Sequence, residues 1–89
     1  MASFLISYDL DKPGQDYQAL TDRLKKLGAV KVLLSEWIIV GSYACKDLRD
    51  DLKQYIDSND KLLVVKLTGE AAWTQTMISD ERLKQLLQG

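Results

Sequence analysis

The 89-residue chain contains no histidine and a single cysteine, Cys45. Without imidazole, most zinc sites lose a common ligand, and neither Ser-His nor Cys-His catalytic pairs can form. One cysteine cannot form an intrachain disulfide, so we expect a reducing compartment and a cytoplasmic location. These absences exclude many classes of enzyme and leave the carboxylates as the main candidates for chemistry.

Long apolar runs are also absent: none approaches the roughly 18 residues of a membrane span, so we expect no membrane partner. The formal net charge is -1, which lacks the strong positive field of a general nucleic-acid binder. Hydrophobic residues make up 46% and charged residues 28%, as is typical of a single globular domain. A domain this small is marginally stable, so association would stabilise it.

The first half of the chain predicts a strand, a helix and a hairpin. Residues 2–9 alternate between two faces, and the break 11–14 contains Pro13 and Gly14. The next apolar residues recur at helical steps, with Asp16 as the expected N-cap and Gly28 as the end: Tyr17, Leu20, Leu24 and Leu27. Residues 29–34 and 37–41 are rich in branched aliphatic residues and predict two strands, joined by a turn at Ser35-Glu36.

The second half predicts a helix, a strand and a last helix. Residues 46–56 carry one apolar stripe, made of Leu48, Leu52, Tyr55 and Ile56. Residues 61–68 predict the fourth strand. Ser79 is the expected N-cap of a short helix that carries Leu83, Leu86 and Leu87.

This order of elements predicts an α+β fold, a ferredoxin-like βαββαβ sandwich. The four-stranded sheet is expected to be antiparallel, with two helices on one face because right-handed crossovers place them there. Residues 1–68 would form this ferredoxin-like domain and 69–89 a C-terminal extension with a short helix, so that the chain is a single domain overall.

The second face of the predicted sheet also carries apolar side chains, which soluble monomers rarely expose over a large area. Two covers are available: the terminal segment 73–88, or a second copy of the chain that packs sheet against sheet. We favour the second copy and therefore expect a homodimer. The two covers can also act together, because a tail can add to the edge of its partner's sheet.

Asp9, at the end of the first strand, is the leading candidate for chemistry. If the strands lie in the order fourth, first, third, second, one rim gathers the carboxylates of Asp9, Asp11, Glu36 and Asp60. Oxygen-rich clusters suit magnesium, or manganese in its place, and such a metal can activate water for phosphodiester cleavage. The hypothesis makes Asp9, Asp11 and Glu36 metal ligands. The alternative is that Asp9 caps the following turn and the other carboxylates are solvated.

Three further features allow two readings each. Ser35 is a candidate to contact a phosphate beside Asp9 or is simply a turn serine. Trp37 is a candidate to stack on a base or is buried at a core or dimer contact. The one basic concentration is a candidate nucleic-acid contact or a solvated helix end that the helix dipole favours; it consists of Arg23, Lys25, Lys26 and Lys31.

Three segments carry a resemblance to a known family: Tyr8-Asp9-Leu10, Lys25-Lys26-Leu27-Gly28-Ala29, and the hairpin from Val32 to Gly41. Over roughly residues 1–67 the chain resembles the CRISPR-associated Cas-two family. Members are ferredoxin-like homodimers; some are described as metal-dependent nucleases and others as structural, DNA-binding partners in spacer integration. The resemblance maps the family's strand-terminal aspartate onto Asp9 and its hairpin serine onto Ser35.

Two functions follow as expectations. The resemblance implies a Cas-two-like homodimer that acts as a magnesium-dependent endonuclease, with Asp9 and Ser35 in the catalytic site. The chain departs from the family in having no arginine soon after Asp9 and a mildly acidic charge. The alternative is a non-catalytic module of the same fold that assembles with a protein partner or binds nucleic acid. A third reading, a small-molecule-binding domain, has no specific motif.

Overall fold

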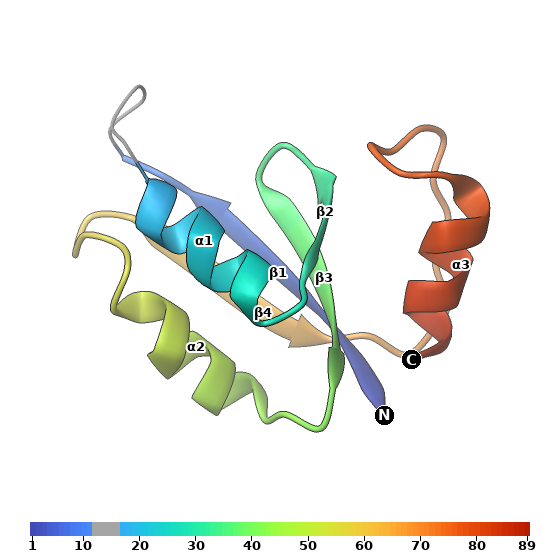
Figure 1. Ribbon diagram of the computed structural model, residues 1–89, viewed down its shortest axis with the longest axis horizontal. Coiled ribbons are helices and arrows are strands. Elements are labelled where there is room, and N and C mark those ends of the chain that lie inside the picture. The colour runs from blue at the N-terminus through green and yellow to red at the C-terminus, as the bar shows by residue number, and fades with distance from the viewer. Residues whose placement is uncertain (12–16) are drawn as a thin grey trace.

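A computed structural model of the chain describes residues 1–11 and 17–89. Its four-stranded antiparallel sheet has the strand order β2-β3-β1-β4, so the predicted α+β class is confirmed (Figure 1). Among the described residues no helix is long and apolar enough to cross a membrane. The elements along the chain are β1 (Ala2–Asp9), α1 (Gln18–Lys26), β2 (Val30–Leu33), β3 (Glu36–Gly41), α2 (Cys45–Lys53), β4 (Lys61–Lys66) and α3 (Asp80–Gln88).

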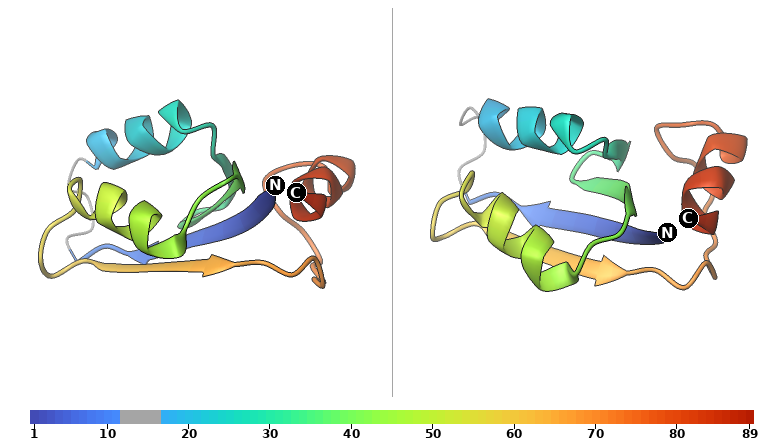
Figure 2. Two further views of the ribbon diagram at one scale, coloured as in Figure 1. Left: turned by 90° about the horizontal axis from the view of Figure 1, so that it is seen from below. Right: turned by 60° about the horizontal axis from the view of Figure 1, so that its bottom comes forward.

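The main core lies between the sheet and the helices α1 and α2, which cover the same face (Figure 2). The predicted alternation of β1 is confirmed, because Phe4 and Ile6 are buried on this face. The helices contribute four leucines at helical spacing to the same cluster: Leu20, Leu24, Leu48 and Leu52. Burial of these apolar side chains is the main force that holds both helices on the sheet.

A second core lies on the opposite face, where α3 packs over β2, β3 and the first part of β1. Val32 and Ile38 of the sheet are buried against Leu83 and Leu86 of α3. Ser79 caps this helix as predicted, since its hydroxyl accepts a hydrogen bond from Arg82 N at 3.2 Å. Over β2 and β3, therefore, the extension covers the second face, and the expectation that a second copy does so is wrong for this part of the sheet.

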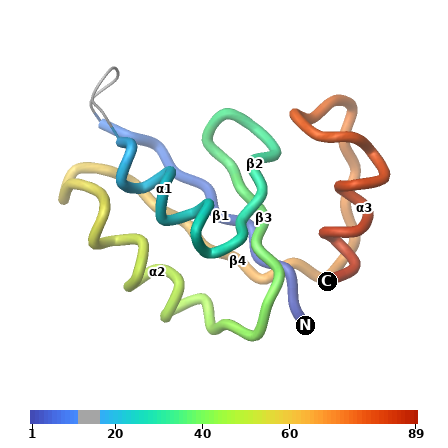
Figure 3. Tube along the Cα trace, in the orientation of Figure 1, coloured from blue at the N-terminus to red at the C-terminus, as the bar shows by residue number. Residues whose placement is uncertain are grey.

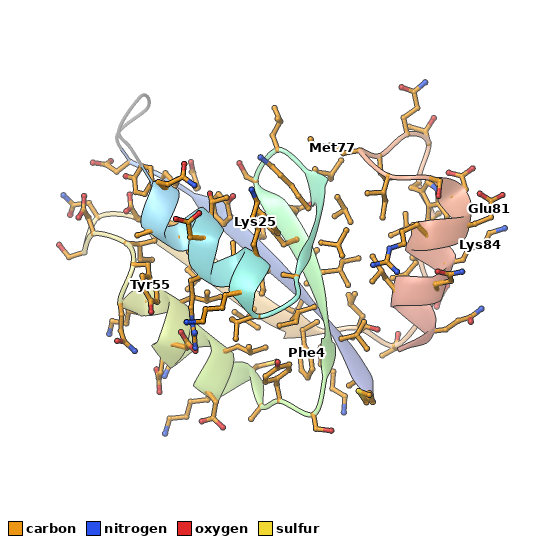
Figure 4. The ribbon with its side chains drawn as sticks, in the orientation of Figure 1. Phe4, Lys25, Tyr55, Met77, Glu81 and Lys84 are labelled. Carbon is orange, nitrogen blue, oxygen red and sulfur yellow. The ribbon has the colours of Figure 1, made fainter. Side chains whose placement is uncertain are left out.

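The end of α3 is attached to the beginning of β1. The buried Ser3 hydroxyl donates to the carbonyl of Leu86, which also accepts from Gly89 N at 3.2 Å, so the hydroxyl links the last turn of the helix to the strand. The two chain termini consequently lie side by side (Figure 3). On the other side of α3, Glu81 and Lys84 point away from the sheet (Figure 4).

Several predicted boundaries are wrong, each for a local reason. The hairpin turn is Leu34-Ser35, because Glu36 pairs with Ser7 and Leu33 and so begins β3. The predicted helix 46–56 ends at Lys53, after which the backbone hydrogen bonds become i to i−3 bonds.

The other boundary corrections concern β4 and α1. β4 ends at Lys66 rather than at residue 68. Asp16 lies outside the described residues, and Tyr17 occupies the N-cap position of α1. Gly28 follows the helix with a φ of 86°, a left-handed conformation that suits glycine and agrees with its predicted role as the stop.

Candidate functional site

Asp9 is the last residue of β1 and is exposed. Its Cα partner across the ladder is Lys61 at the start of β4, and strand alternation places both residues on the face opposite α1 and α2. Among the described residues its carboxylate forms no hydrogen bond and no ion pair. The alternative reading, in which Asp9 caps the next turn, therefore has no supporting contact in the described part of the chain.

The carboxylate that stabilises this connection is Asp60, which is predicted to share the rim with the three proposed metal ligands. Its Oδ1 accepts hydrogen bonds from Asp11 N at 2.7 Å and from the Tyr17 hydroxyl at 3.0 Å. Its Oδ2 accepts from Asp57 N at 2.7 Å. Asp60 thus joins the connection after β1 to the turn before β4. Its oxygens therefore have a structural role, which the residues on either side of it in the sequence do not indicate.

The predicted metal ligands do not come together within one chain. Asp11 lies beside Asp60 through its backbone nitrogen, whereas Glu36 stands opposite Ser7 on the other side of β1. Within residues 1–11 and 17–89, no three side chains of Asp, Glu, Cys or His are placed to share a metal ion. The set Asp9, Asp11 and Glu36 therefore does not fit a magnesium ion in a single chain.

Ser35 lies close to the end of β1, as the rim hypothesis requires. It is exposed in the hairpin turn, and its carbonyl accepts a hydrogen bond from Tyr8 N at 3.1 Å. Trp37 is 2% exposed and its Nε1 donates to the Tyr8 hydroxyl at 3.0 Å. The prediction of a buried tryptophan is confirmed, because a ring enclosed in this way has no surface for stacking on a base.

The predicted basic patch is divided among different contacts. Arg23 forms a bidentate pair with Asp51 of α2, at 2.9 Å from Nε and 2.6 Å from Nη2. Its hydrogen bonds lower the pKa of the Asp51 carboxyl. Lys25 and Lys26 are exposed, and the ammonium of Lys31 lies 5.9 Å from the centroid of the Trp37 ring.

One part of the second sheet face is not covered by α3. We call it the open face and define it by the second-face residues of β4 and of the last part of β1, which are Ser7, Asp9, Lys61, Leu63 and Val65. Leu63 is 58% exposed and Val65 is half-buried. Leu63 lines a shallow hollow of about 220 Å³ together with Ser7, Asp9 and Lys61. The sequence pattern predicted an uncovered apolar face here but not that it would be limited to this half of the sheet.

No protein-family model matches the chain, and no solved structure matches it. The resemblance to the Cas-two family accordingly depends on three short segments alone: residues 8–10, 25–29 and 32–41. The geometry of the described residues leaves the open face uncovered and the Asp9 carboxylate on it without a partner.

Proposed function

We propose that the chain is a ferredoxin-like assembly module that works as a homodimer, in which two copies meet through their open faces. The observation that carries this proposal is Leu63, an aliphatic side chain in the middle of a strand that is nevertheless 58% exposed. Val65 adjoins it on the same face. Packing of two such faces removes apolar surface from water on both copies at once.

The charges of the open face favour pairing of identical copies. Asp9 and Lys61 stand next to each other at one end of it, and neither belongs to an ion pair among the described residues. In a two-fold contact, residue i of one copy meets residue j of the other and the reverse. Two open faces can therefore place each Asp9 near the other copy's Lys61, which stabilises the contact and fixes its orientation.

The second candidate is metal-dependent phosphodiester cleavage in a Cas-two-like homodimer. The exposed Asp9 carboxylate, which has no partner among the described residues, favours it because a dimer would bring two such groups to one interface. One chain does not gather a set of metal ligands in its described residues, so this activity depends on the dimer. Ser35 would then contact the nucleic-acid phosphate from the neighbouring turn.

Sedimentation equilibrium tests the assembly proposal. We expect the wild type to be dimeric at tens of micromolar and Leu63→Glu to be monomeric, because the variant places a charge in the apolar contact. Gln85→Glu, on the exposed side of α3, is the matched control for the added charge and should stay dimeric. Circular dichroism confirms that each variant is folded. A wild type that remains monomeric well above that concentration would refute the proposal.

A nuclease assay tests the second candidate. Wild type, Asp9→Ala and the control Asp47→Ala on α2 are incubated with labelled DNA or RNA in magnesium, in manganese and in chelator. Cleavage that requires metal and is lost only in Asp9→Ala supports the activity. Equal cleavage by all three proteins indicates a contaminating nuclease. If the proteins are dimeric and none cleaves, the assembly role remains and the catalytic one is wrong.

A further inference from the structure

A second surface, which adjoins the open face at Leu63, lies between α2 and the outer edge of β4. We call it the edge groove and define its lining by Lys46, Arg49, Lys53, Ile56, Leu62 and Val64. Two adjoining hollows of about 570 and 280 Å³ make up the groove, and they share Arg49 and Leu62. In Figure 1, α2 and β4 lie near one another along this side of the molecule.

The wall of the edge groove is basic. Lys46, Arg49 and Lys53 follow one another at three- and four-residue steps and so form a single stripe along α2. One nearby carboxylate, Asp50, is paired with Arg49 at 2.9 Å. Two more carboxylates, Asp57 and Asp60, line the end of the larger hollow, and Asp60 already accepts bonds from two backbone N–H groups and a tyrosine hydroxyl. The positive charge that the stripe offers to a ligand therefore comes from Lys46 and Lys53, although the whole chain has a net charge of -1.

The floor of the groove is an open strand edge. β4 is the terminal strand of the sheet, and no described strand pairs with its outer side. Leu67 N donates inward to the Ser3 carbonyl at 2.9 Å. Because the bonds of an antiparallel ladder alternate, the backbone N–H and C=O groups of Leu62, Val64 and Lys66 point outward. An incoming strand would find both donors and acceptors there.

A second copy of the chain is a poor occupant of this edge. Two β4 edges in an antiparallel pair would bring both α2 stripes together, and the lysines at the two ends of β4, Lys61 and Lys66, would add to the repulsion. Lysine on an edge strand is a common means by which proteins avoid pairing with themselves. The same charges attract a segment of opposite sign.

We propose that the edge groove binds an extended acidic peptide segment of a partner protein, which adds to β4 as a further strand. Its backbone would pair with Leu62, Val64 and Lys66, and its acidic side chains would face the α2 stripe. A single-stranded nucleic acid fits less well, because its phosphates provide no donors for the outward carbonyls of β4.

The dimensions agree with a peptide of alternating character. The stripe from Lys46 to Lys53 spans about 10 Å along a helix, the length of about three residues of a strand. Side chains that face the helix recur at every second residue of the added strand. Two acidic side chains separated by one residue lie about 7 Å apart, a distance that the long side chains of Lys46 and Lys53 can bridge from the two ends of the stripe, while the residue between them faces the other side of the sheet.

Calorimetry with a capped peptide of about eight residues, in which glutamate alternates with valine, tests this proposal. We expect the full chain to bind the peptide, and Lys46→Glu/Lys53→Glu to bind it roughly tenfold more weakly. The control Lys25→Glu/Lys26→Glu makes the same change of charge on α1 and should bind as the wild type does. Val65→Glu, on the open face and outside both hollows of the groove, should retain binding, which separates this site from the dimer surface.

Two further probes test the mode of binding. Methylation of the peptide nitrogens on the side that faces β4 should abolish binding, whereas methylation of the alternate set should preserve it, because strand addition uses only one set. The proposal is overturned if the peptide does not bind at millimolar concentration, if both double variants weaken it equally, or if the two methylated peptides behave alike. A different ligand would also overturn it: the peptide does not bind, whereas an oligothymidylate binds the wild type and binds Lys46→Glu/Lys53→Glu more weakly, with no such loss in Lys25→Glu/Lys26→Glu.

Discussion

The sharpest test of the fold is the substitution Leu83→Ala in α3, because it asks whether the C-terminal helix belongs to the same cooperative unit as the sheet. Leu83 is 5% exposed and packs in the cluster that contains Val32, Ile38 and Leu86. Truncation of a buried leucine removes apolar contacts and leaves a cavity, at a cost of about 2–5 kcal/mol. Domains of this length have a total stability of only about 4–13 kcal/mol, so the loss is a large fraction.

Urea unfolding followed by circular dichroism measures the effect. With a slope of about 1–3 kcal/mol per molar urea, the midpoint should fall by roughly 1 M or more, in a single transition. Gln85→Ala is the matched control, because it lies on the exposed side of the same helix and should change stability by less than about 0.5 kcal/mol. If Leu83→Ala unfolds at the same midpoint as the control, the packing of α3 on the sheet does not stabilise the fold and the reasoning is wrong.

Three further predictions concern individual polar contacts. Ser3→Ala removes the buried hydroxyl that bonds the end of α3, so thermal unfolding should show a loss of about 1–2 kcal/mol, or several degrees in Tm. Asp60→Ala leaves the donors of two connections without their acceptor and should lower the urea midpoint by an amount equivalent to about 1–3 kcal/mol. The pKa of Asp51 is lowered by Arg23, so the Tm advantage of the wild type over Asp51→Asn should be present above the ordinary value of 3.8 and disappear as the pH falls further. A Tm difference that stays constant down to strongly acidic pH would contradict this assignment.

Much of the fold could be predicted because its signals are local. Alternation in β1 places Phe4 and Ile6 on one face whatever the rest of the chain does, and the leucine spacing in α1 and α2 fixes their buried sides. Gly28 and Ser79 mark helix ends through backbone chemistry that acts over a few residues. Boundaries were less predictable, because they depend on pairing with distant residues.

The candidate site could be predicted only in part, because its chemistry depends on contacts between distant segments. Asp60 and Asp9 are both aspartates next to the end of a strand, yet Asp60 accepts hydrogen bonds from Asp11, Tyr17 and Asp57, and Asp9 has no partner among the described residues. Nothing in the residues around Asp51 indicates that Arg23 lies beside it, since the two are on different helices. Sequence patterns identify which residues are polar, but the tertiary fold decides which of them remain available.

The two proposed surfaces meet on β4, and the chemistry of this strand keeps them distinct. Leu63 and Val65 face away from the helices, where apolar surface favours a second copy, whereas Leu62 and Val64 face α2 and the groove. The lysine at the start of the strand, Lys61, opposes edge-to-edge pairing of copies but can pair with Asp9 across a face-to-face contact. Face-to-face association leaves the outward backbone groups of β4 unpaired. A dimer would therefore still carry two open edges, and each could bind an acidic strand without disturbing the contact between the copies.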